Sequence, residues 1–318
     1  MFAPYRMTLE IIHVFAVRIA NIVGTHRALY KYMKTTTTSR DEKVSSAINA
    51  IDAGVAAFRN GDDWTKWLKL QSQFHTYSFN NTMMIMLQCP TATRVAGYET
   101  WKKAGRQVKK GEKGIPIFAP VGLGKAKERS EETGEERVVR TWLRFKIVYV
   151  FDVNQTEGDE LPTITRAIPE TPFASNIETL RAVALGLDGI VSSIDVRSRE
   201  GGDSRTAGGW YCPATKSIVV IDEGSDAAKF RVLVHEVAHA ILHGKDDHHG
   251  RPEKEVEAES VAFVVCDALG LDTSCKSFGY VASWMTDAGP NAIKASADRI
   301  AKAAKTVLDA LLGSASAD

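Results

Sequence analysis

Two histidines four residues apart, His235 and His239, with Glu236 next to the first, constrain this chain more than any other feature. On an α-helix, positions i and i+4 share a face, so both imidazoles can bind one tetrahedral metal ion while the carboxylate leans toward it. Apolar residues frame the run and no helix breaker interrupts it, which predicts a buried helix; they are Val232, Leu233, Val234, Val237, Ala238, Ile241 and Leu242. This pattern is typical of zinc-dependent hydrolases.

The third metal ligand is expected on a second predicted helix, within residues 252–263. Glu255 and Glu259 share a face of that helix because they are four residues apart. We assign Glu255 as the ligand and Glu259 as the acceptor for the free ring nitrogen of a ligating histidine, which would fix the tautomer. The reverse assignment is also open. Two imidazoles and a carboxylate favour Zn²⁺ as the cofactor over other divalent ions.

This ligand set predicts hydrolysis of a peptide bond in a protein substrate. The open fourth position would hold water, whose pKa a catalytic zinc ion lowers to about 7. Glu236 would act as the general base and then as the proton donor to the leaving amine. The group that stabilises the oxyanion stays unassigned among four candidates: Tyr211, His248, His249 and Tyr280.

The segment before the histidine helix, residues 209–222, predicts a β-hairpin. Its second arm, residues 217–221, is rich in β-branched side chains and ends just before the helix. Such an edge strand could bind an extended substrate by strand addition. A structural strand that covers the helix is the other interpretation, and the two are compatible.

The length of 318 residues predicts about two domains, and 44% hydrophobic residues suffice for a core in each. The four cysteines have neither zinc-ribbon spacing nor the density of a secreted scaffold, so we expect reduced thiols and a cytoplasmic protein. The apolar run at residues 9–23 contains His13 and Arg18 and is too short to span a bilayer, so no membrane partner is expected. Met33 is a plausible start, and the residues before it are expected to be dispensable.

The predicted fold class is α+β in two parts. A mixed helix and sheet DNA-binding domain is expected at 41–156, after an N-terminal extension at 1–40. A proline-bearing linker at 157–173 would lead to an α+β zincin-like metallopeptidase domain at 174–312 and a disordered tail at 313–318. Helices are expected at 42–60 and 65–76, and the charged stretch 124–140 is expected to be a solvated loop between two strands.

A basic segment runs from residue 94 to residue 113, with seven basic residues against two acidic ones. Aromatic residues are interleaved with the charges. Charges suit phosphates and ring faces suit bases, so the segment predicts a groove for single-stranded DNA, although a solvated helix face would look similar and Trp101 could be a core residue. The candidate contacts are Arg94, Tyr98, Trp101, Lys102, Lys103, Arg106, Lys109, Lys110 and Lys113.

Three motifs within residues 77–81, 92–101 and 105–114 resemble the single-stranded-DNA-binding domain of antirestriction proteins of the ArdC type. The resemblance covers about residues 40–155, and residues 149–156 resemble the closing strand of that domain. In that family the domain is joined to a zinc metallopeptidase-like domain. The resemblance therefore implies metal ligands at His235, His239 and Glu255, and Glu236 as the catalytic acid and base.

The short connection at residues 244–255 is more similar to compact peptidases of the ImmA and IrrE type, which cleave or regulate repressors. The predicted function is a single-stranded-DNA-binding zinc metallopeptidase of antirestriction or mobile-element type, with a repressor or a restriction component as candidate protein substrates. The alternative is a DNA-shielding antirestriction factor with a structural zinc fold and no peptidase activity. A stress-response regulator that cleaves a repressor without DNA is a third hypothesis.

Overall fold

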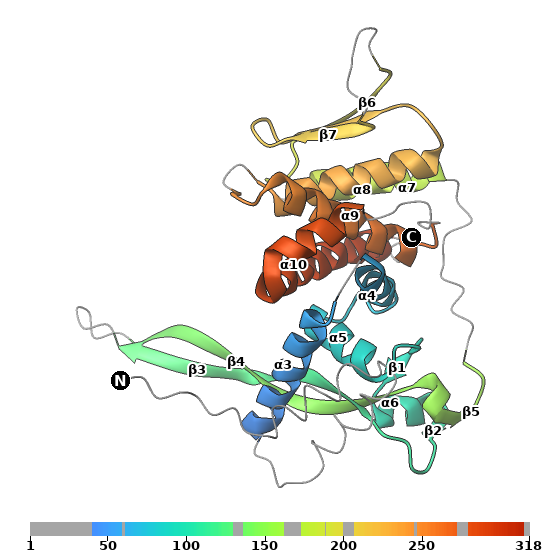
Figure 1. Ribbon diagram of the computed structural model, residues 1–318, viewed down its shortest axis with the longest axis vertical. Coiled ribbons are helices and arrows are strands. Elements are labelled where there is room, and N and C mark those ends of the chain that lie inside the picture. Colours follow the sequence, from blue (N-terminus) through green and yellow to red (C-terminus); the bar gives the residue numbers. More distant parts are fainter. Residues whose placement is uncertain are drawn as a thin grey trace. The chain divides into compact units, whose positions relative to one another are not determined.

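The computed structural model describes residues 40–58, 61–129, 136–161, 173–187, 189–199, 207–244, 247–271 and 279–314 (Figure 1). Most of the expected N-terminal extension, most of the linker and the last residues of the tail lie outside these ranges. The described chain is a mixed α+β structure, as expected. Among the described helices, none combines the length and the apolar character needed to cross a membrane.

The chain divides into two compact units. One comprises Met1–Gly54 and Met83–Asp159, and the other comprises Val55–Thr82 and Glu160–Asp318. This division differs from the expected domains in one respect, because residues 55–82 belong to the second unit.

The first unit contains a long antiparallel hairpin of β3 (Ile115–Arg129) and β4 (Glu136–Asp152), and β1 (Val95–Ala96) pairs with the far end of β4 (Figure 1). The expected loop at 124–140 is wrong, because strand pairing continues to Arg129 and resumes at Glu136. The pairing is made by backbone N–H and C=O groups, so charged residues can take part in the strands. The other elements are α3 (Arg40–Ala56), α5 (Phe79–Gln88), α6 (Tyr98–Lys103), β2 (Arg106–Val108), the 3-10 turn η1 (Val153–Gln155) and β5 (Thr156–Gly158), with α3 and α5 each running into the second unit.

A buried carboxylate, Asp152, joins three segments at the end of β4. Its Oδ2 accepts the backbone N–H of Thr93 at 2.8 Å and that of Arg94 at 3.2 Å, and its Oδ1 accepts the backbone N–H of Asn154 at 3.0 Å. Gln155 completes a capping box with Asp152 and donates from Nε2 to the carbonyl of Lys113 at 2.9 Å. The motif that resembles the family's closing strand is therefore a structural junction.

We expect Asp152→Ala to lower the free energy of unfolding of the first unit by roughly 2–4 kcal/mol, because it leaves three partly buried backbone N–H groups without an acceptor. Urea unfolding followed by circular dichroism measures this loss. Glu157→Gln is the matched control, since Glu157 is exposed on neighbouring β5. Equal stability of the two variants would contradict the junction.

The second unit builds a three-stranded sheet next to a stack of helices (Figure 1). Its strand order is β6 (Ser193–Arg197), β8 (Ser217–Ile221), β7 (Gly209–Cys212), with β6 parallel and β7 antiparallel to β8. The predicted hairpin is present, but its second arm is the central strand because β6 pairs with its other side. The edge strands of this sheet are therefore β6 and β7, and β7 is the edge strand of the hairpin. The helices are α4 (Gly61–Gln73), α7 (Phe173–Gly186), α8 (Asp226–Leu242), α9 (Arg251–Ala268) and α10 (Gly279–Ser314).

Tryptophans explain why residues 55–82 belong to this unit. Trp64 and Trp67 of α4 are fully buried, and their rings contact each other and those of Phe79 and Trp284. The indole N–H of Trp64 also donates to Ser260 Oγ of α9 at 2.9 Å. Large aromatic side chains bury enough area to dominate local packing, so α4 is anchored on the face of α9 and α10.

Candidate metal centre

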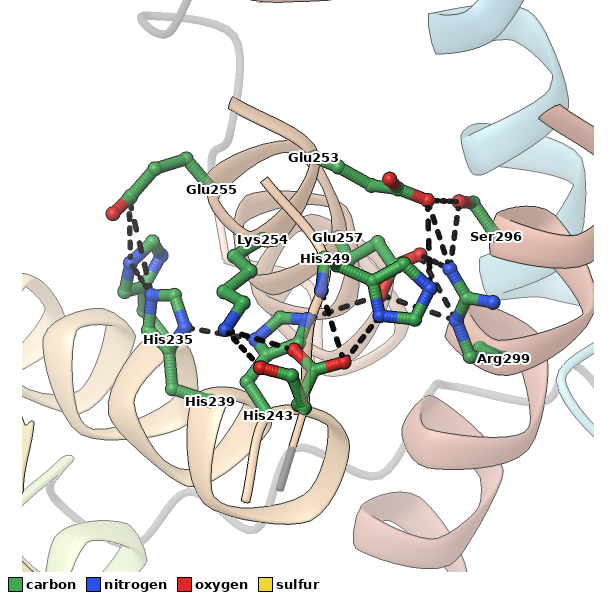
Figure 2. Close-up of polar contacts among 11 residues, drawn as sticks. His235, His239, His243, His249, Glu253, Lys254, Glu255, Glu257, Ser296 and Arg299 are labelled. Atoms are coloured by element: carbon green, nitrogen blue, oxygen red, sulfur yellow. Dashed lines mark hydrogen bonds and ion pairs between the residues drawn. The ribbon is translucent and has the colours of Figure 1, made fainter. Parts of the chain in front are cut away.

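The two histidines of α8 and one glutamate of α9 converge on a single point (Figure 2). Nε2 of His235 lies 3.1 Å from Nε2 of His239, and Glu255 Oε2 lies 3.5 Å from the first and 3.8 Å from the second. The helix is set by an N-cap at Ser225, whose hydroxyl accepts the N–H of Ala228, and by an apolar face that is buried in the core.

These separations fit a metal ion. Donors about 2.0–2.1 Å from a tetrahedral zinc ion lie about 3.4 Å from one another, close to the three observed distances. The neighbouring imidazoles of His235 and His239 also hold the pKa of Glu255 well below its usual range, so this carboxylate is ionised at neutral pH. The three residues thus form a candidate site for a divalent metal ion, and the spacing leaves room for further coordination.

Glu236 lies beside this triad, at the wall of a cavity of about 930 Å³. The side chain is 7% exposed, and burial raises the pKa of its carboxyl despite the neighbouring histidines. The backbone N–H of Tyr211 on β7 acts in the opposite direction and lowers the pKa of this carboxyl. A buried carboxylate with a raised pKa, oriented next to metal ligands, suits a group that takes and returns a proton.

The edge strand β7 forms another wall of the cavity through Gly209, Trp210 and Tyr211. Of the four residues considered for the oxyanion, Tyr211 therefore lies at the site. His248 is exposed and His249 pairs with Asp247, and neither lines this cavity. The side chain of Tyr280 lies outside the described residues.

Gly209 permits the close approach of β7 to α8. A Cβ atom there would lie 2.7 Å from the carbonyl oxygen of Val219, 2.7 Å from Val232 Cγ1 and 3.4 Å from Glu236 Cγ. The first two separations are shorter than van der Waals contact, so any larger residue must displace the strand or the helix.

We expect Gly209→Ala to cost roughly 1–3 kcal/mol of stability, as overpacking of a close-packed core does. Thermal unfolding of the purified protein measures the loss. Gly186→Ala at the end of α7 serves as the control, because a Cβ atom there meets nothing within 4 Å. A Gly209→Ala variant as stable as this control would refute the tight contact.

Glu259 lies where the sequence analysis expected it, one turn beyond Glu255. Its Oε2 is 3.3 Å from Nδ1 of His235, on the ring edge opposite the triad, and its Oε1 pairs with Arg231. The carboxylate can therefore accept the Nδ1–H of His235, which leaves Nε2 as a lone-pair donor.

Three further residues behind the triad were missed. Nδ1 of His239 lies 2.9 Å from Nδ1 of His243, and Nε2 of His243 lies 3.0 Å from Oε2 of Glu257. Arg299 of α10 binds the same carboxylate, with Nε 3.1 Å from Oε1 (Figure 2). Burial raises the pKa of Glu257, but the hydrogen bonds from His243 and Arg299 outweigh it and the net shift is downward. His243 could have been found from the sequence, because it follows His239 by four residues. No sequence pattern pointed to Arg299.

Two of the predicted DNA contacts in the first unit have structural roles. Trp101 is 4% exposed, and its indole N–H donates to the carbonyl of Phe151 at 2.8 Å, so its ring is a core element. Arg106 donates from Nε to Thr156 Oγ1 at 2.8 Å and from Nη2 to the Thr156 carbonyl at 3.1 Å, which ties β2 to β5. Burial excludes the Trp101 ring from base stacking, so we remove Trp101 from the candidate set, whereas the half-buried Arg106 stays a predicted contact.

The remaining candidate DNA contacts differ in their exposure to solvent and in their hydrogen bonds. Tyr98 and the lysines of the set are exposed, while Arg94 is half-buried; Lys109 Nζ donates to the carbonyl of Asn154 at 3.0 Å. The structure adds two exposed aromatic residues on β4, Phe145 and Tyr149, the latter 46% exposed. They are four residues apart and so lie on the same face of the strand, outside the basic segment of residues 94–113.

The N-terminal part of the chain is similar to a known protein family. Residues 37–151 match the family model for the N-terminal domain of the anti-restriction factor ArdC, which confirms the resemblance of that part of the chain. An uncharacterized protein of Bacillus anthracis is 26% identical over 290 residues, which cover 80% of this chain and 48% of that protein. The chain thus spans about half the length of this relative.

Two crystal structures of the antirestriction ArdC protein from the R388 plasmid are also similar. The match to the metal-free structure has a TM-score of 0.45 and 24% sequence identity, and it covers 74% of this chain and 85% of the ArdC chain. The match to the Mn(II)-bound structure has a TM-score of 0.51 and 21% sequence identity, and it covers 84% of this chain and 97% of the ArdC chain. The second likeness shows a shared fold.

Proposed function

We propose that this chain is an antirestriction-type protein whose N-terminal part binds single-stranded DNA and whose second unit is a zinc-dependent metallopeptidase. The observation that carries the enzymatic proposal is the triad of His235, His239 and Glu255, with Glu236 beside it at the wall of a large cavity. The match of residues 37–151 to the ArdC N-terminal domain supports the antirestriction assignment.

The residues around the cavity suit peptide hydrolysis. A divalent ion held by the triad would supply a water activated as a nucleophile at neutral pH. Glu236 is placed to take the proton from the nucleophile and to return it to the leaving amine. The backbone of edge strand β7 can pair with an extended peptide and direct it along the cavity.

Zinc is the metal that we propose, because two imidazoles and one carboxylate are a set typical of catalytic zinc sites. The related ArdC protein was crystallised with Mn(II), so the metal is itself a subject for the test. Metal analysis of the purified protein should show about one zinc ion per chain that His235→Ala removes.

Exchange of Glu236 for Gln should abolish cleavage while the metal is kept. A positioned general base contributes about 10²–10⁴-fold to the rate, so we expect at least a 100-fold loss of cleavage of an unfolded protein such as casein. The metal content of the same preparation shows whether cleavage was lost while the metal site stayed intact. Cleavage at the wild-type rate would contradict the role of Glu236.

A second candidate function is a DNA-shielding antirestriction factor without peptidase activity. The similarities to ArdC favour it, since the matching family and both crystal structures are described as antirestriction proteins. Transfer of a plasmid into a restricting host distinguishes the two functions. The peptidase proposal expects Glu236→Gln to lose protection, and the shielding proposal expects full protection from the same variant.

DNA binding should depend steeply on salt. Combined replacement of Lys102, Lys103 and Lys110 by Gln should reduce the slope of log affinity against log salt by about 2, given about 0.7 per phosphate contact for single strands. Tyr149→Ala should weaken binding by roughly 1–3 kcal/mol and leave the slope unchanged, because a ring stacks on bases without neutralising phosphates.

Fluorescence anisotropy with a labelled oligonucleotide at several salt concentrations measures both effects. Lys66→Gln is the control, since Lys66 is an exposed lysine of the second unit. A salt slope near zero in the wild-type protein would exclude a phosphate-binding groove, and a change equal to that of the control would exclude the chosen lysines.

A further inference from the structure

A third histidine, His243, is the C-cap residue of helix α8 and lies next to the metal ligand His239. His243 follows His239 by four residues, as His239 follows His235, so the three imidazoles lie on successive turns. Unlike the other two, His243 is only 3% exposed, and its partner Glu257 is 0% exposed. The contact between His239 and His243 is therefore shielded from water.

The donors and acceptors along this chain of contacts can be assigned from its buried end. Arg299 binds Glu257 with Nε 3.1 Å from Oε1 and 3.3 Å from Oε2, so the carboxylate is held as an ion and can only accept. Nε2 of His243, 3.0 Å away, must therefore be the donor. In the neutral imidazole this leaves Nδ1 of His243 as an acceptor.

The same reasoning assigns the ring proton of the proposed metal ligand His239. Nδ1 of His239 lies 2.9 Å from the accepting Nδ1 of His243, so His239 carries its proton on Nδ1. Its Nε2 then has a free lone pair, and this is the atom that faces His235 at 3.1 Å and Glu255 at 3.8 Å (Figure 2). A ligating imidazole needs this tautomer.

The other histidine ligand has a shorter version of the same arrangement. Nδ1 of His235 faces Glu259 directly at 3.3 Å, and Glu259 pairs with Arg231. Both ligands are thus backed by a carboxylate that an arginine holds. His239 differs because an imidazole lies between the ligand and the carboxylate.

We propose, on the basis of the proposed metal centre, that His243 is a positioning residue that transmits the hydrogen-bond direction of the Arg299–Glu257 pair to His239 and so fixes the tautomer that binds metal. The interposed imidazole accepts on one side and donates on the other. Reversal of its direction would place a proton on Nε2 of His239, where the metal binds.

Glutamine at position 243 provides a sharp test, because its amide also offers an acceptor on one side and a donor on the other. Leucine at 243 offers neither. Glu257→Gln keeps the shape but removes the obligate acceptor, so the direction is no longer imposed. Glu253→Gln is the matched control, because Glu253 also binds Arg299, at 3.0 Å, but has no contact with His243 among the described interactions.

The experiment is a Co²⁺ titration followed by visible absorption, with Zn²⁺ competition, on the full chain. We expect Glu257→Gln and His243→Leu to bind metal 10- to 100-fold more weakly, as loss of such outer contacts does at other metal sites. His243→Gln should recover most of the affinity, and Glu253→Gln should stay within threefold of wild type. Thermal unfolding of the metal-free proteins shows that each variant is folded.

A second readout follows the tautomer itself. Long-range ¹H–¹⁵N spectra of histidine-labelled, metal-free protein resolve the protonated ring nitrogen of each of the eight histidines, with a His239→Gln spectrum for assignment. His239 should carry its proton on Nδ1 in the wild type and shift toward Nε2 in Glu257→Gln. A purely structural network would change unfolding temperatures but not this signal.

Two outcomes would overturn the proposal: wild-type affinity and tautomer in Glu257→Gln, or equal affinities in His243→Gln and His243→Leu. Failure of the wild-type protein to bind Co²⁺ or Zn²⁺ is a different result. It would remove the metal centre on which the proposal rests and would count against the proposed function as well.

Discussion

The contact between α8 and α9 is the constraint on which the candidate site depends. It brings the carboxylate of Glu255 on α9 to within 4 Å of the imidazoles of His235 and His239 on α8. Buried apolar side chains of both helices surround these polar groups in sequence. Both helices bury valines and alanines, including Val234, Val237 and Ala238 on α8 and Val256 and Val261 on α9. Small side chains let the helices approach closely, and close packing then restricts where the polar groups can lie.

Helix α9 carries two rows of glutamates with different partners. Glu255 and Glu259 face the histidines of α8, whereas Glu253 and Glu257 face Arg299 of α10. A buried charge is costly unless it is paired and hydrogen-bonded. The pairing with Arg299 and His243 meets this requirement for Glu257, so the helix can carry four carboxylates without losing its buried position.

The division of the chain affects how the N-terminal part is understood. The segment that matches the ArdC N-terminal domain includes α4, yet α4 contributes its tryptophans to the core of the second unit. A chain that began after the first unit would leave this face of α9 and α10 uncovered. Sequence families and compact units therefore do not coincide here, because an aromatic cluster binds a helix to the unit where it buries the most area.

The sequence by itself determined the local chemistry. The spacing of His235, Glu236 and His239 specifies a helix face, and the spacing of Glu255 and Glu259 specifies another, because helical periodicity is a property of the chain alone. The apolar periodicity of the histidine helix and the hairpin at residues 209–222 follow in the same way. Two helices expected at 42–60 and 65–76 are observed at Arg40–Ala56 and Gly61–Gln73.

Only the tertiary structure decided which long-range partners these faces meet. Arg299 reaches Glu257 across 42 residues, and Trp64 reaches Ser260 across 196, distances over which no local pattern carries information. Burial likewise turned Trp101 from a predicted base-stacking ring into a core residue, and pairing with β6 made β8 a central strand. Such outcomes depend on how several elements share one core, which periodicity within a single element does not specify.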